Sequence, residues 1–168
     1  MEKYQMAFEA YLSAKGFLLS ADSLLKAGQK DFKKLFSSYM YPMTVNVSFA
    51  CELFIKSLLT ICGIKYPRGR DGHKLQDNYA LLPGDVQTNI ENLYKQSEQN
   101  ESIADLLNTY NNAFPDWRYA FEHKNDDDNS LTVAWTAFFC FAHALQEECG
   151  NKIESCPLFS DLAAMGGE

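Results

Sequence analysis

The hydrophobic positions of the chain are densest in residues 42–63, PMTVNVSFACELFIKSLLTICG, a segment that is apolar on almost every helical face. Glu52 and Lys56, four residues apart, are its only charged residues. Pro42 occupies the first expected turn, where a missing N–H costs nothing, and Gly63 follows the end as a stop. The segment is about six turns long and is interrupted by polar residues, so it predicts the core helix of a bundle rather than a membrane span.

Weaker amphipathic patterns before and after this segment predict further helices. No stretch of useful length alternates apolar and polar residues with the period of two that a half-buried strand requires. We therefore predict an all-α protein, an up-and-down bundle of four to five helices in a single domain. The expected core helices cover about residues 3–27, 42–63, 84–123 and 131–149, and residues 150–168 form a tail.

Glycine, proline and polar residues predict where these helices are interrupted. Gly28 is expected to close the first helix, and the restriction that Pro42 places on the residue before it favours a break at Tyr41. The polar residues 95–102 are expected to form a connector inside the third helical region. A short helix is expected near residues 75–82, within the loop region that follows the core helix.

The last expected helix carries more apolar surface than one seam of a bundle needs. Its seam is formed by Leu131, Trp135, Phe138, Ala142 and Leu145. Phe139 and Phe141 fall outside that seam, so a second apolar face has to be covered. A partner subunit is one candidate for the cover, and the C-terminal tail with Leu158, Phe159 and Leu162 is the other.

The composition narrows the class of protein. A chain of 168 residues with an apolar fraction of 46% can bury a core without metal or disulfide staples. The net charge of −7 argues against a broad nucleic-acid surface but leaves room for a small basic site. The five cysteines match no metal-binding spacing, and the N-terminus lacks signal-peptide features. We therefore expect reduced thiols, no metal, no cofactor, no membrane partner and a cytoplasmic location.

Two short segments are basic in this otherwise acidic chain. The loop after the core helix carries Lys65, Arg68, Arg70 and Lys74, together with His73, against Asp71 alone. Such a loop is a candidate nucleic-acid or nucleotide-binding surface, and the alternative is a loop that only aids solubility. A smaller basic patch, with Lys30, Lys33 and Lys34 around Phe32 and Phe36, leads into the core helix.

The chain contains no Walker loop, HExxH, GxSxG or SxxK motif, so the common nucleotidase, protease, hydrolase and lactamase chemistries have no support. The remaining candidate is FPDWRYAFEHK, residues 114–124, which holds Arg118 and His123. Arginine binds a phosphate through two parallel hydrogen bonds and stabilises charge as it builds on phosphorus. Histidine moves a proton near neutral pH. Together they suffice for metal-free attack of an RNA 2′-hydroxyl on the neighbouring phosphodiester.

Competing interpretations of Arg118 follow from helical geometry. Positions i and i+5 diverge by about 140° on a regular helix, so Arg118 and His123 converge only at a bend or with another surface. Arg118 and Glu122 are four residues apart and favour a pair along the helix. A further alternative is that Arg118 pairs with the buried Glu52 and sets the register of the core helix.

Three segments, in this order, give the chain a resemblance to a known family. They are ELFIKSLL (52–59), GHKLQDNYALLP (72–83) and WRYAFEH (117–123). The first is similar to an E-L-x-x-K-x-L-L core helix, the second to a G-H-x-L-x-x-L segment and the third to an R-x(4–6)-H motif. This ordered set resembles the HEPN domain, the higher-eukaryote and prokaryote nucleotide-binding family of α-helical bundles, over about residues 40–145.

The resemblance implies a fold and a first functional hypothesis. Many HEPN proteins dimerise and are metal-independent endoribonucleases of toxin–antitoxin or phage-defence systems. Carried over, Arg118 would clamp the phosphate, His123 would transfer the proton, and Glu52, Lys56 and Glu122 would support or orient them. The expected partners are a second copy, RNA or a nucleotide, and an antitoxin or nucleotidyltransferase. The alternative is a non-catalytic HEPN module that binds a nucleotide or a protein partner.

Overall fold

The computed structural model of the chain describes residues 2–112 and 135–156, and within these ranges it contains helices and no strand. The all-α bundle predicted from the sequence is therefore confirmed. The elements are α1 (Glu2–Lys30), α2 (Phe32–Lys34), the π-helical turn η1 (Leu35–Tyr39), α3 (Met40–Ile61), the 3₁₀ turn η2 (Gly69–His73), α4 (Leu75–Ala80), α5 (Gly84–Lys95), α6 (Ile103–Tyr110) and α8 (Trp135–Glu154).

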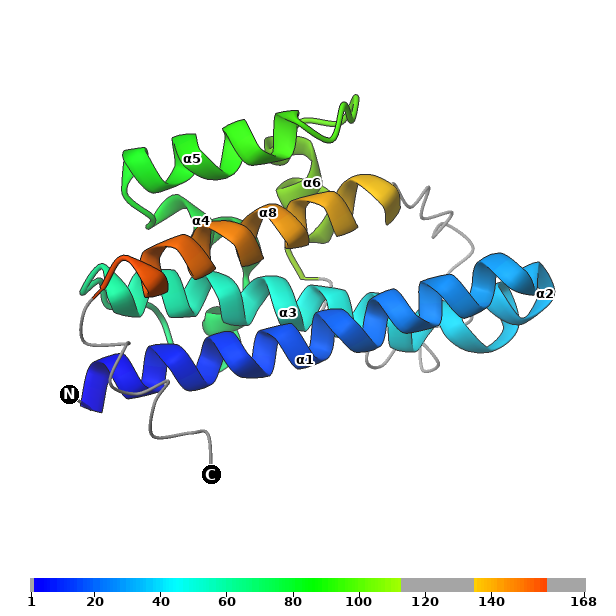
Figure 1. The fold of residues 1–168 in the computed structure, drawn as a ribbon, viewed down its shortest axis with the longest axis horizontal. Helices are drawn as coiled ribbons and strands as arrows, with labels where there is room; N and C mark the ends of the chain where they lie inside the picture. The colour runs from blue at the N-terminus through cyan, green and yellow to red at the C-terminus, as the bar shows by residue number, and fades with distance from the viewer. Residues whose placement is uncertain (1, 113–134, 157–168) are drawn as a thin grey trace.

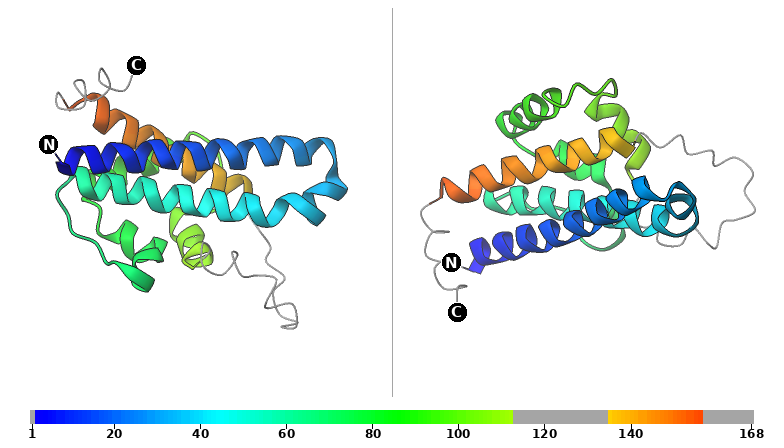
Figure 2. Two further views of the ribbon diagram at one scale, coloured as in Figure 1. Left: turned by 90° about the horizontal axis from the view of Figure 1, so that it is seen from below. Right: turned by 45° about the vertical axis from the view of Figure 1, so that its right-hand side comes forward.

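The long helices α1 and α3 run antiparallel and are joined at one end of the molecule by α2 and η1 (Figure 1). Helix α8 packs on α3 and also touches α1, and α5 packs on the opposite side of α8. Helices α4 and α6 contact each other, and α6 also contacts α8 (Figure 2). The core thus lies between the α1–α3 hairpin and α8.

Helix α3 is the core helix that the hydrophobic pattern predicts. Its buried residues are Met43, Thr44, Val47, Ser48, Ala50, Cys51, Glu52, Phe54, Ile55, Ser57, Leu58 and Leu59. By length and composition it is the one described helix apolar enough to cross a membrane, but 61% of that window is buried inside the bundle, as expected of a core helix. Gly63 ends it with φ +76°, with Ile64 N–H donating to the Leu59 carbonyl at 2.9 Å.

Two predicted helix ends are wrong. Tyr41 is not a break, because α3 begins at Met40 and helical backbone runs from Phe32 onward; the interruption is at Asp31. Pro42 is the third residue of α3 and follows directly on the π-helical turn η1. Gly28 does not close α1 either, and instead its missing side chain makes room for Leu35, which a Cβ at this position would overlap.

The apolar surplus of the last helix is covered within the chain. Helix α8 extends to Glu154, beyond the predicted end at 149, and both Phe139 and Phe141 are buried. The rings of Phe141 and Tyr79 meet edge to face with their centroids 5.8 Å apart, and the ring of Phe138 stacks on that of Tyr110 with a centroid distance of 4.0 Å. The seam of α8 and its second apolar face, with Phe139 and Phe141, are therefore buried without a partner subunit. The homodimer stays a prediction that rests on the family resemblance.

The remaining helical predictions meet the structure in part. The connector at 95–102 is confirmed, because α5 ends at Lys95 and α6 begins at Ile103, so this part of the predicted region 84–123 forms two helices. The short helix near 75–82 is confirmed as α4. The rest of that region, the start of the last predicted helix and the tail beyond 156 lie outside the described residues.

Candidate functional site

A carboxylate buried in the middle of α3 organises the polar contacts of the core. Glu52 is 1% exposed, and Lys56 lies one turn later on the same helix with its Nζ 2.5 Å from Glu52 Oε1. Burying an unpaired carboxylate is costly, and the nearby Lys56 ammonium offsets part of the cost of burying Glu52. The spacing of four residues places the two side chains on one helical face without any tertiary help.

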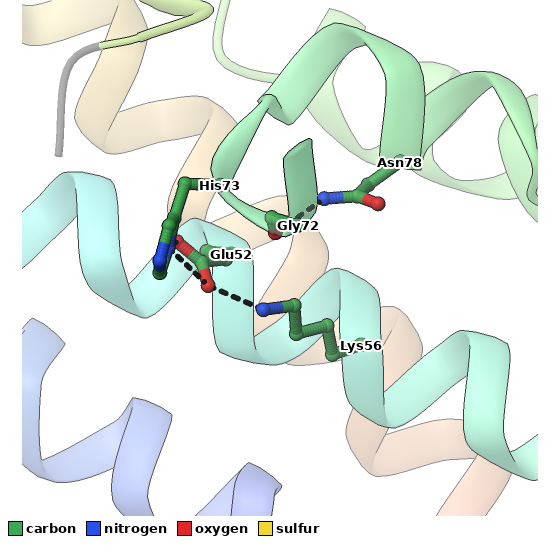
Figure 3. A network of polar contacts seen from close by, with 5 residues as sticks. All are labelled: Glu52, Lys56, Gly72, His73 and Asn78. Atoms are coloured by element: carbon green, nitrogen blue, oxygen red, sulfur yellow. Dashed lines mark hydrogen bonds and ion pairs between the residues drawn. The ribbon is translucent and has the colours of Figure 1, made fainter. Parts of the chain in front are cut away.

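A second partner reaches Glu52 from the loop that follows α3. His73, at the end of η2, has its Nδ1 3.1 Å from Glu52 Oε1 and 3.0 Å from Oε2 (Figure 3). The histidine side chain is 35% exposed, whereas Glu52 is enclosed. Glu52 thus holds a lysine and a histidine at the same time, and through His73 it anchors the loop to the core helix.

The loop reaches this position because its backbone packs tightly. Gly72 is buried, and a Cβ there would lie 2.7 Å from the Pro67 carbonyl oxygen, so only glycine fits without a backbone shift. The buried Asn78 of α4 donates from Nδ2 to the Gly72 carbonyl at 2.9 Å (Figure 3). Asn111 accepts from Leu75 N–H through its backbone carbonyl at 3.1 Å and fixes the start of α4.

The predicted basic loop therefore lies against the cluster of Glu52, Lys56 and His73. Lys65 and Arg68 are exposed, and Lys74 pairs with Asp77 at 3.9 Å. The Lys56 ammonium also lies 5.7 Å from the centre of the Tyr66 ring, a cation–π contact with the same loop. The arrangement combines a rigid, internally neutralised anchor with solvent-facing cations, which suits the binding of an anion more than proton transfer by Glu52.

The structure brings His73 of the basic loop to Glu52 and Lys56, the charged pair that the sequence places on the core helix. Gly72 and Asn78 were missed as residues that position the loop, because neither stands out from the polar residues around it. Arg118, Glu122 and His123 lie outside the described residues, as does the side chain of Arg70. The contacts described for Glu52 come from Lys56 and His73, while its predicted partner Arg118 falls in the undescribed part.

A second buried glutamate lies between α5 and α8. Glu148 is 2% exposed and accepts from Asn89 Nδ2 at 3.2 Å, and Lys152 Nζ is 3.9 Å from the same oxygen, Oε1. These side chains line a cavity of about 450 Å³ with Asn92, Leu93, Asn151 and Ser155. Across the described ranges, no three histidine, cysteine or acidic side chains gather closely enough to hold a metal ion.

Comparison of the chain with protein-family models, with curated proteins and with solved structures finds no match. The resemblance to HEPN domains therefore rests on the three sequence segments themselves.

Proposed function

We propose that this chain is a HEPN-like domain that binds RNA at its basic loop and cleaves it without a metal, using Arg118 and His123. One observation carries the proposal: the first two segments of the resemblance, separated by residues 60–71, meet through the contact of His73 with Glu52. Both segments thereby contribute to a single anchor, which fits the idea that they are parts of one motif set.

The charge distribution around this anchor supports the binding half of the proposal. Glu52 is fully occupied by Lys56 and His73, so it does not cancel the exposed charges of Lys65 and Arg68. Two or more cations on a fixed loop attract a phosphodiester backbone even on a protein with a net charge of −7.

The chemical step of the proposal needs only the protein and RNA. The 2′-hydroxyl attacks the adjacent phosphorus, the bond from phosphorus to the 5′-oxygen breaks, and the products are a 2′,3′-cyclic phosphate and a 5′-hydroxyl. His123 transfers a proton in this step, and Arg118 stabilises the charge on the phosphate oxygens. A second copy of the chain would supply the face that brings the two side chains together, and an antitoxin or nucleotidyltransferase would be the regulating partner in the cytoplasm.

Cleavage of RNA by the purified protein in the presence of EDTA tests this function. Wild type is expected to leave 2′,3′-cyclic phosphate ends, and Arg118→Ala and His123→Ala are expected to abolish cleavage. Arg118→Lys keeps the charge but loses the two-pronged contact, so most activity should be lost as well. Lys95→Ala, on exposed α5 surface, is the control and should cleave like wild type. Equal cleavage by wild type and the Arg118 and His123 variants would reject the assignment.

The contacts of the anchor also favour a second candidate, a non-catalytic module that binds a nucleotide or a protein. Because both oxygens of Glu52 hold structural partners, the described polar cluster is built to position a loop. Calorimetry with nucleotides and single-stranded RNA should then show saturable binding without cleavage, weakened in Lys65→Ala and Arg68→Ala. Absence of heat with all of these ligands would leave only the protein-binding version.

A further inference from the structure

The end of the α1–α3 hairpin presents apolar side chains to solvent. Phe32 is 69% exposed and Phe36 is 49% exposed, although both are large aromatic residues. They lie in α2 and η1, at the extremity of the long axis of the molecule (Figure 1). Large apolar residues that sit together on a surface mark an interaction site more often than scattered ones do.

The two rings are held in a fixed arrangement. Phe32 and Phe36 meet edge to face, with their ring centroids 4.9 Å apart. The ring of Phe36 also packs against Trp135, the first residue of α8, with a centroid distance of 6.0 Å. Asp31 caps α2 by accepting from the Lys34 N–H at 3.1 Å. Leu35 is buried over Gly28 and fastens the turn to α1. The hairpin end is therefore an ordered apolar knob.

Among the described residues, lysines lie next to this knob. Lys26, Lys30, Lys33 and Lys34 are all exposed, and Asp31 is the only acidic residue between positions 26 and 34. Asp31 lies 3.5 Å from Lys34, an exposed pair that leaves the local charge strongly positive. The chain as a whole has a net charge of −7, so the knob is a local exception.

We propose that the hairpin end docks reversibly on an anionic lipid surface, with Phe32 and Phe36 entering the headgroup region and the four lysines facing the lipid charges. The shape of the knob favours lipid over single-stranded RNA. The rings pack edge to face with their centroids 4.9 Å apart, so they form a compact apolar tip and not a pair of parallel ring faces on which successive bases stack. An exposed apolar tip with lysines beside it suits insertion into the interface of an anionic membrane.

This proposal is independent of the RNA hypothesis and concerns surface association only. No membrane partner was expected from the sequence, because its most apolar segment, α3, is predicted as a core helix. Surface docking by Phe32 does not involve α3, and it depends on the exposure of that ring, which only the folded hairpin reveals.

Co-sedimentation of the full chain with vesicles tests the proposal. Wild type should bind vesicles that contain phosphatidylglycerol, bind pure phosphatidylcholine far less, and dissociate at high salt. Phe32→Ala should lower the partition constant about tenfold, and Phe32→Leu should restore most of it. Lys30→Ala and Lys33→Ala should each lower the constant about fivefold. Phe32 is exposed, so its variants should keep the circular dichroism of wild type.

Matched control variants distinguish vesicle binding by the knob from nonspecific binding by other exposed apolar or basic residues. Leu81→Ala removes a 40% exposed side chain at the end of α4, and Lys95→Ala removes a lysine on α5; both should bind like wild type. Failure of wild type to bind anionic vesicles at low salt would overturn the proposal. The same holds if Phe32→Ala instead abolishes binding of single-stranded RNA, or converts a dimer to a monomer in light scattering.

Discussion

The two buried glutamates, Glu52 in α3 and Glu148 in α8, solve the same problem in different ways. Each is at most 2% exposed and belongs to a long apolar helix. Glu52 contacts Lys56 at 2.5 Å and His73 at 3.0 Å, both charged or chargeable. Glu148 accepts from the neutral amide of Asn89 at 3.2 Å, and its lysine is 3.9 Å away.

The difference shows how a buried carboxylate acquires a role in the fold. Glu148 lines a cavity of about 450 Å³ between α5 and α8, and its two partners are a neutral amide and a lysine 3.9 Å away. Glu52 has two close nitrogen partners, Lys56 and His73, and His73 lies 21 positions later in the chain. Glu52 therefore couples the basic loop to the core helix, whereas Glu148 joins two neighbouring helices through weaker contacts.

The largest expected effect comes from removing the closest charge partner of Glu52. Lys56→Met leaves the carboxylate of Glu52, which is 1% exposed, with His73 as its remaining partner among the described residues, and we expect a loss of about 3 kcal/mol in the free energy of unfolding. Lys152→Met removes the distant partner of Glu148 and should cost less than about 1 kcal/mol. Urea unfolding of both variants measures the contrast, and equal losses would show that the two glutamates do not differ as described.

A smaller effect is expected from disturbing the loop that carries His73. Gly72→Ala would place a Cβ 2.7 Å from the Pro67 carbonyl oxygen, so the backbone has to shift, at a cost of about 2 kcal/mol. Gly16→Ala is the matched control in α1, where nothing lies within 4 Å of the new Cβ, and it should stabilise by roughly 0.5–1 kcal/mol. A neutral Gly72→Ala in thermal unfolding would mean that the loop is not held at this point.

The smallest expected effect is a change in the alkylation rates of the cysteines adjacent to the two glutamates. Cys51 and Cys149 are buried, and burial raises the pKa of both thiols, that of Cys149 to about 12. At pH 8 both stay protonated in the closed protein, so alkylation requires local opening, and partly exposed Cys140 and Cys156 should react first. Lys56→Met should accelerate labelling of Cys51 more than that of Cys149. Labelling is measured by mass spectrometry. The same acceleration at Cys51 and Cys149 would argue against a local effect of Lys56 on the surroundings of Glu52.

Part of the candidate site was predictable from the sequence. Lys56 follows Glu52 by four residues on an apolar helix, so a contact between them is dictated by helix geometry alone. His73 was named as a site residue because of the segment it belongs to, but its contact with Glu52 could not be predicted. That contact depends on the path of the loop, which is set by Gly72, Asn78 and the packing around them.

By itself the sequence determined the features that arise from local periodicity: the all-α class, the core helix α3, its stop at Gly63 and the break between α5 and α6. Tertiary packing decided the remainder. It placed Leu35 against Gly28, buried Phe139 and Phe141 inside one chain, and left Phe32 in solvent. Periodicity tells which face of a helix is apolar because neighbours one turn apart share that face, but what covers the face depends on residues that are distant in sequence.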